Sequence, residues 1–234
     1  MPDSPTGRAH DVVLRHIEDS LHSGALKLGD RLPGERALAE QFGISRASVR
    51  DAIRTLEVMG VVRSATGSGP NSGTIVVSDP SSALGVALRM HVASHHLPLK
   101  DVVEARMMME TWSLEHAASV PWTPEQLNDA RLLLEAMDDD ALPSQIFTLL
   151  DTQFHVALSA LAGNVVVSTM MESMREAIRG YIDDAVARRG TWDEVVPTLR
   201  EHHRGIFEAV EAREGERAAR LVREHIEWFY RQAL

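Results

Sequence analysis

Apolar side chains recur at helical spacing, with short breaks, from residue 82 to residue 233. Proline and glycine mark the breaks, and no alternating β pattern of useful length lies between them. The pattern predicts an all-α helical bundle over residues 79–234, which is long enough to bury a core. We expect its helices at residues 82–95, 99–119, 124–137, 144–162, 165–188, 192–213 and 215–233.

A different order of elements is predicted for residues 1–78. Apolar side chains at helical spacing indicate helices over residues 11–23, 35–42 and 46–59, with a turn at Gly43 between the last two. Two short β-like runs, VVRS and GTIVV, then flank a glycine-rich segment. Helix, helix, turn, helix and hairpin is the order of a winged helix-turn-helix domain. The predicted fold is therefore mainly α, with this domain preceding the bundle.

Charge divides the chain at the same place. The net charge is −10, but residues 1–78 carry nine basic and nine acidic side chains, so the whole excess lies in residues 79–234. This asymmetry suggests two domains with different partners. The absence of cysteine excludes disulfides, thiolate metal ligands and cysteine nucleophiles. With no signal peptide and no membrane span in the pattern, we expect a cytoplasmic protein that does not contact a membrane.

The predicted helix over residues 46–59 carries three arginines on one face. Arg46, Arg50 and Arg54 are spaced by four residues, and Ser45 and Ser48 lie beside the first of them. Arginine can bind O6 and N7 of guanine in the major groove, and serine can bind a base edge or a phosphate. A solvated basic face is the alternative interpretation. The accompanying short helix, turn and hairpin favour binding to double-stranded DNA.

Two positions outside this helix are placed to meet the DNA backbone. Arg36 begins the preceding helix, where a phosphate contact is expected. Gly67 lies in the glycine-rich tip of the wing, whose small side chains can approach a backbone or a minor groove.

The segment LKLGDRLPGERALAEQFGISRASVRDAIRTLEVMGVV closely resembles the DNA-binding domain of the GntR family of bacterial transcription regulators. The resemblance covers about residues 10–77 and places glycines, prolines and arginines in register. It implies a homodimer that binds a palindromic operator. Two departures are Gly34, which stands where a serine cap is usual, and a wing longer than the usual tip. The operator contacts that the resemblance implies are Arg36, Ser45, Arg46, Ser48, Arg50 and Gly67.

Four residues of the predicted bundle are candidates for a metal site. Asp151 and His155 lie one turn apart on one helix and border its buried face. His203 and His225 interrupt the apolar stripes of the last two helices. A buried carboxylate and buried imidazoles need partners, and one divalent metal ion would satisfy all four.

Each histidine taken alone is more typical of a core histidine held by hydrogen bonds, so the argument rests on the combination. The adjacent His202 leaves the choice of ligand open, although the apolar stripe favours His203. Three nitrogen ligands and one oxygen ligand suit Zn, Ni, Mn, Co or Fe, of which we expect Zn. These ligands leave open positions on a six-coordinate ion, whereas a structural zinc site is usually closed and tetrahedral.

Arg106, on the predicted helix over residues 99–119, can clamp a carboxylate with two parallel hydrogen bonds if it faces inward. The alternative is a pair with Glu110 on a solvated face. Residues 99–233 resemble the all-helical effector domain of the FadR-type subfamily, in its metal-binding branch. That resemblance implies an effector-binding role for Arg106 and a metal ligand set of Asp151, His155, His203 and His225.

We therefore expect a transcription repressor, not an enzyme, whose operator affinity depends on a small carboxylate bound at the metal. The segments ATGSGPNSGTI, EAR, DTQFH and EHIEWFY resemble actinobacterial regulators of L-lactate utilisation. A 2-hydroxy acid such as L-lactate can chelate one ion. Citrate, another dicarboxylate and a sugar acid are alternative effectors. The rivals are a metalloenzyme, for which no placed general acid or base is found, and a structural metal in a bundle fused to a DNA-binding module.

Overall fold

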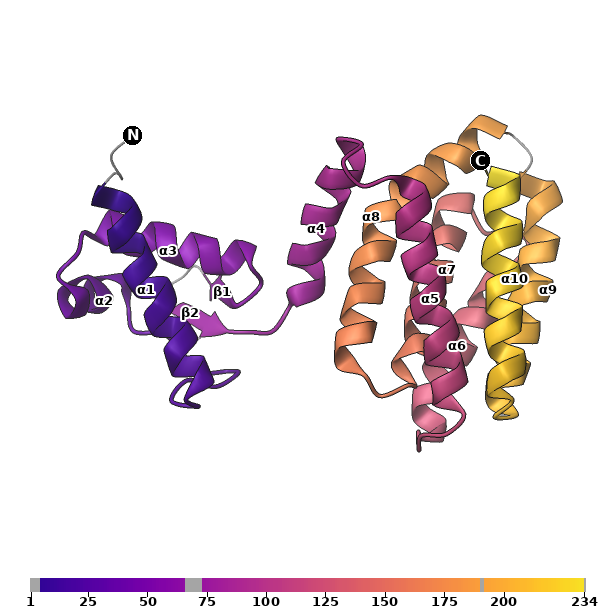
Figure 1. Ribbon diagram of the computed structural model, residues 1–234, viewed down its shortest axis with the longest axis horizontal. Helices are drawn as coiled ribbons and strands as arrows, with labels where there is room; N and C mark the ends of the chain where they lie inside the picture. The colour runs from indigo at the N-terminus through magenta and orange to yellow at the C-terminus, as the bar shows by residue number, and fades with distance from the viewer. Residues whose placement is uncertain (1–4, 66–72, 190–191, 234) are drawn as a thin grey trace. The chain divides into compact units, whose positions relative to one another are not determined.

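The computed structural model describes residues 5–65, 73–189 and 192–233, and within these ranges it contains ten helices and one two-stranded sheet (Figure 1). The predicted mainly α fold is confirmed. The chain forms two compact units, Met1–Leu84 and Gly85–Leu234.

The first unit is a winged helix-turn-helix. Three helices pack around one apolar core that includes Val13, Leu38, Val49 and Ile53. An antiparallel strand pair follows, in which Val62 lies opposite Val76. The elements are α1 (Pro5–His22), α2 (Glu35–Phe42), α3 (Arg46–Val58), β1 (Val62–Ala65) and β2 (Gly73–Val76). The first helix begins before the predicted residue 11; proline is favourable at a first helical position because its missing N–H has no partner there.

The turn between α2 and α3 follows from its local sequence. Gly43 adopts a left-handed conformation with φ of 63°, and its N–H donates to the carbonyl of Ala39. Ser45 then caps α3, since its hydroxyl accepts a hydrogen bond from the backbone N–H of Ser48 at 3.0 Å. The predicted turn and cap are both present.

The second unit is an all-helical bundle. Its last six helices begin at the predicted residues and end within two residues of the predicted ends. The helices are α4 (Pro80–Ala93), which spans the boundary between the units, α5 (Leu99–Ala117), α6 (Pro124–Met137), α7 (Ser144–Ala160), α8 (Val165–Arg189), α9 (Trp192–Glu211) and α10 (Gly215–Ala233). Among the described residues, no helix is both long and apolar enough to cross a membrane.

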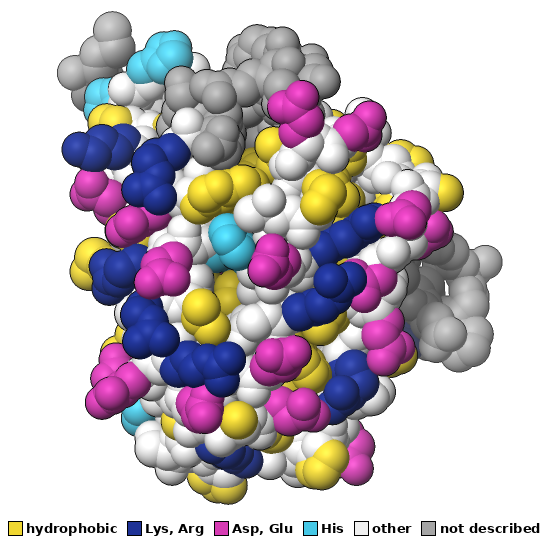
Figure 2. All heavy atoms as spheres, turned by 90° about the vertical axis from the view of Figure 1, so that its right-hand side faces the viewer, with side chains coloured by type: hydrophobic (Ala, Val, Ile, Leu, Met, Phe, Trp, Pro, Cys, Tyr) yellow, Lys and Arg dark blue, Asp and Glu magenta, His cyan; other side chains and the backbone are white. Residues whose placement is uncertain are grey.

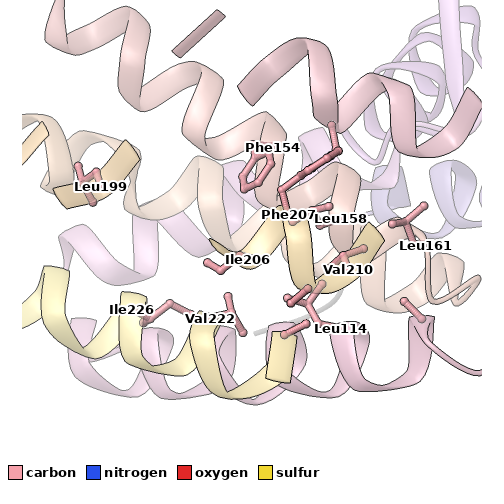
Figure 3. Packing of buried hydrophobic residues seen from close by; sticks show 14 of the residues in the cluster. Leu114, Phe154, Leu158, Leu161, Leu199, Ile206, Phe207, Val210, Val222 and Ile226 are labelled. Carbon is pink, nitrogen blue, oxygen red and sulfur yellow. The ribbon is translucent and has the colours of Figure 1, made fainter. Parts of the chain in front are cut away.

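The core of the bundle lies between α5, α7, α9 and α10. The helix α10 packs against α5 and α9, and α7 packs against α5, α6 and α8. Figure 3 shows apolar side chains from these helices meeting in one cluster, among them Leu114, Phe154, Ile206 and Val222. Polar groups that point into this core are therefore removed from water.

Candidate metal centre and DNA interface

Four side chains from three helices converge inside the second unit. Asp151 and His155 lie on α7, His203 on α9 and His225 on α10, and their candidate ligand atoms all lie within 4.8 Å of one another. The three histidines are 1 %, 0 % and 3 % exposed. Two opposite nitrogen ligands on one ion, each bonded at about 2.1 Å, would lie about 4.2 Å apart. The structure thus brings together the four residues predicted as ligands, at nearly the spacing that one ion needs.

Four of the six ring nitrogens of these histidines have no hydrogen-bond partner. Nε2 of His155, both nitrogens of His203 and Nδ1 of His225 are buried without a hydrogen bond. Nε2 of His203 lies 3.0 Å from Oδ1 of Asp151, which is itself a candidate ligand. Buried polar atoms are rarely left unpaired in native proteins. A cation that accepts several lone pairs at this point fits the donor set.

The electrostatic surroundings favour the protonation states that bind metal. Burial, and then nearby His203 and His155, hold the pKa of His225 well below its ordinary value. Burial also lowers the pKa of His203. Burial opposes ionisation of Asp151, but Arg175, His155 and His203 together outweigh burial and hold the pKa of that carboxyl well below its ordinary value. Metal ions bind neutral imidazoles and ionised carboxylates, so the centre needs little proton release to take one.

His202 lies outside this cluster. Its ring is partly buried and packs edge-to-face against Trp228, with ring centroids 5.1 Å apart. Of the two adjacent histidines, it is therefore His203 that faces the candidate ligands.

Two buried charged groups whose role the sequence analysis did not predict contact the cluster. Glu110, 1 % exposed, accepts hydrogen bonds from Nε of Arg106 at 2.5 Å and from Nδ1 of His155 at 2.6 Å. Arg175, also 1 % exposed, donates to Oδ2 of Asp151 at 2.5 Å. Glu110 and Arg175 both lie at positions whose helical spacing is that of buried core residues. This spacing is the sequence signal from which their burial could have been predicted.

Arg106 faces inward, with 3 % of its surface exposed. It forms the pair with Glu110 that the alternative interpretation anticipated, but the pair is buried rather than solvated. Burial disfavours both charges, but the opposite charges and hydrogen bonds around each group together outweigh burial, so the pKa of Arg106 is raised and that of Glu110 is lowered. Because both oxygens of Glu110 are engaged, this carboxylate is not free to serve as a general base.

A small cavity of about 20 Å³ adjoins the cluster, room for about one water molecule. Arg106, Asp151 and His225 supply polar lining atoms, and Phe147 and Trp192 form part of the apolar wall.

A cleft of about 200 Å³ shares Phe147 and Trp192 with this cavity. The two rings meet edge-to-face with centroids 5.3 Å apart. Arg200 also lines the cleft, where it donates to Oδ1 of Asp140. Two aromatic side chains thus form the wall that the inner cavity and the cleft have in common.

The arginines predicted to bind DNA are exposed on α2 and α3. Arg36, Arg46 and Arg50 all have solvent-exposed side chains. Arg50 pairs with Glu35 at 3.1 Å, an exposed contact that solvent screens. Ser45 and Ser48 are already engaged in the cap of α3, and Ser48 is only 6 % exposed. The predicted wing contact Gly67 lies outside the described residues.

The outer face of the second unit mixes charges of both signs. Figure 2 shows Lys and Arg side chains interspersed with Asp and Glu. Among the pairs are Arg131 with Glu211 and Arg204 with Asp138, each at 2.6 Å. Such alternation suits a solvated surface, whereas nucleic-acid binding favours clustered basic side chains.

A winged helix-turn-helix joined to a helical bundle with a buried polar centre is the architecture of a ligand-responsive, DNA-binding transcription regulator. Residues 10–70 match the family described as bacterial regulatory proteins, gntR family, and residues 101–227 match the FCD domain. The chain belongs to the GntR family, in the FadR-like subfamily that carries an FCD domain. The GntR domain implies DNA binding, the FCD domain implies a small-molecule effector, and the proteins that match are regulators rather than enzymes.

Several individual proteins are similar over nearly the whole chain. A Bacillus subtilis (strain 168) regulator named YcbG, itself described as uncharacterized, is 29% identical, covering 92% of this chain and 86% of its own. An Escherichia coli (strain K12) protein, provisionally named L-lactate dehydrogenase operon regulatory protein, is 26% identical and covers 95% and 85%. The solved structure of Streptococcus agalactiae GntR has a TM-score of 0.63 at 22% identity, covering 97% and 100%. This last likeness supports the fold.

Proposed function

We propose that this regulator senses a small carboxylate through a divalent metal ion held by Asp151, His155, His203 and His225. The observation that carries the proposal is the set of buried, unpartnered histidine nitrogens beside a cavity lined by Arg106. The protein acts as a homodimer that binds a palindromic operator, and effector binding weakens that binding, as in a repressor.

Zinc is the preferred ion, and nickel, manganese, cobalt and iron suit the same ligands. When bound, the ion supplies positive charge and coordination positions that a carboxylate can occupy. The protein supplies the rest. Asp151 and the histidines hold the ion, and Arg106 offers a planar pair of N–H donors that matches a carboxylate.

We propose a 2-hydroxy acid, L-lactate first, as the effector. A short acid requires the least enlargement of the small cavity, and the E. coli relative is named for an L-lactate dehydrogenase operon. Citrate, another dicarboxylate or a sugar acid would be distinguished by the screen described below.

Binding has to rearrange the bundle, because a cavity for about one water is smaller than any of these acids. The wall of Phe147 on α7 and Trp192 on α9 is the side shared with the cleft. Moving that wall changes how α7 and α9 pack, so one helix arrangement is favoured when the acid is bound. A 100-fold change in operator affinity requires about 2.7 kcal/mol of coupling.

A thermal-shift screen tests this function directly. Metal-loaded and chelator-stripped protein are heated with L-lactate, other 2-hydroxy acids, citrate, dicarboxylates and sugar acids. An acid that binds the folded protein raises Tm, and we expect a rise only in the metal-loaded form. If metal raises Tm but no acid adds to it, the metal is structural. An equal rise without metal would contradict metal-dependent sensing.

Replacing Arg46 with alanine should weaken operator binding by about 1–3 kcal/mol, because a base contact in the major groove is lost. The measurement is fluorescence anisotropy at fixed salt, on a DNA duplex that the wild-type protein selects from a random library. Arg220→Ala on α10 is the matched control, since Arg220 is exposed and lies in the second unit. Wild-type affinity in Arg46→Ala would refute the base-contact role.

A further inference from the structure

We propose that Glu110 is a positioning residue of the metal centre. Its carboxylate holds Arg106 with one oxygen and the ring of His155 with the other, and so determines which ring nitrogen His155 presents to the ion. The inference rests on the proposed function only in that the centre binds a metal. It assigns a role to a residue that supplies no ligand atom itself.

For the neutral His155 ring that can bind a metal ion, the geometry of the three residues leaves one arrangement of protons. Oε2 of Glu110 lies 2.6 Å from Nδ1 of His155, and Oε1 lies 2.5 Å from Nε of Arg106. An ionised carboxylate only accepts hydrogen bonds, so Nδ1 of His155 has to carry a proton. The lone pair of the neutral ring is then on Nε2, which lies 3.6 Å from Oδ1 of Asp151, inside the cluster.

Burial excludes other hydrogen-bond partners for these three side chains. Glu110, His155 and Arg106 are 1 %, 1 % and 3 % exposed, so water does not offer the ring an alternative partner. In metal sites, a carboxylate on the far nitrogen of a histidine ligand fixes the tautomer and ring orientation. Removing such a partner typically lowers metal affinity 10–100-fold.

A glutamine at this position would reverse the tautomer. The side chain of Arg106 can only donate hydrogen bonds, so the amide oxygen of Glu110→Gln has to face Arg106. The amide N–H group then faces Nδ1 of His155, which has to accept. The ring proton moves to Nε2, where it blocks metal binding. A nearly isosteric substitution therefore tests the tautomer rather than the shape of the side chain.

The test compares zinc affinity in wild type and Glu110→Gln by competition with a chromophoric chelator. We expect affinity to fall 10–100-fold. Glu104→Gln is the matched control, because Glu104 lies on the same helix but is exposed and contacts Lys100. The ¹⁵N chemical shifts of the His155 ring in metal-free protein should report a proton on Nδ1 in wild type and on Nε2 in Glu110→Gln. Wild-type zinc affinity in Glu110→Gln, or an unchanged tautomer, overturns the proposal.

A second variant separates the tautomer from the loss of charge, since Glu110→Gln leaves buried Arg106 without its carboxylate. In Arg106→Met/Glu110→Gln the arginine no longer fixes the amide, whose oxygen can turn to accept from Nδ1 of His155. We expect tighter zinc binding than in Glu110→Gln alone, with the proton back on Nδ1. If Glu110→Gln does not fold, the ring tautomer of wild-type His155 decides: a proton on Nε2 in the metal-free protein contradicts the proposal.

Failure of this inference is distinguishable from failure of the proposed function. Wild-type protein that binds no zinc or other divalent ion overturns both. Wild-type protein that binds zinc, with Glu110→Gln equal to it, overturns only the role of Glu110.

Discussion

Replacing His203 and His225 together with alanine should reduce the metal content from about one ion per chain to about none. The double variant retains only Asp151 and His155, which lie one turn apart on α7, so the ion would lose every ligand from α9 and α10. Two ligands from one helix surface hold a divalent ion far more weakly than four that enclose it. The measurement is elemental analysis of protein dialysed against buffer with the metal at a fixed, low concentration.

His202→Ala is the matched control for this experiment. His202 adjoins His203 and its ring meets those of Trp228 and His225, but it supplies none of the candidate ligand atoms, so its loss should leave most of the metal content in place. Circular dichroism of the metal-free variants checks that the bundle still folds. Full metal content in the double variant would show that other residues hold the ion. Loss of the metal in His202→Ala would show that His202, rather than His203, is the ligand.

Replacing Arg106 with lysine should strongly weaken the response to the effector while sparing metal and operator binding. Lysine keeps a positive charge beside buried Glu110 but lacks the planar fork that holds a carboxylate with two hydrogen bonds. A charge-assisted hydrogen bond is worth about 1.5–3 kcal/mol, so about 10-fold to 150-fold more acid should be needed. The measurement is operator binding by anisotropy while the acid found in the thermal-shift screen is titrated into metal-loaded protein.

Arg220→Lys makes the same chemical change on an exposed face of α10 and should leave the response unchanged. If Arg106→Lys responds to the acid as wild type does, Arg106 does not grip the effector. If the variant instead loses its metal, Arg106 serves the metal centre through Glu110 and His155.

Much of the fold could be predicted because residues that favour helix ends mark the limits of most helices. Pro124, Ser144 and Gly215 stand at helix starts, and the periodicity between such positions is that of amphipathic helices. The predicted start of α1, residue 11, lies six residues after the observed start at Pro5, because the first two turns, PTGRAHD, carry little apolar periodicity.

The candidate site could be predicted only in part. The sequence identifies His203 and His225 as candidate ligands because each is a polar residue within an apolar stripe. Such a stripe can be recognised within a single helix, without knowing how the helices pack. The partners of the site depend on how helices pack against one another. Glu110 reaches His155 across α5 and α7, and Arg175 reaches Asp151 across α8 and α7. A single sequence contains no measure of such inter-helix register, so these contacts required the structure.

Anomalous diffraction at the zinc absorption edge, from crystals of the zinc-loaded protein, would locate the ion. We expect one peak per chain within about 2.0–2.2 Å of a carboxylate oxygen of Asp151 and of one nitrogen from each of His155, His203 and His225. We also expect a coordination position without a protein ligand on the side of the cavity lined by Arg106. A peak elsewhere in the bundle, or an ion enclosed on every side by protein ligands, would refute metal-dependent sensing at this site.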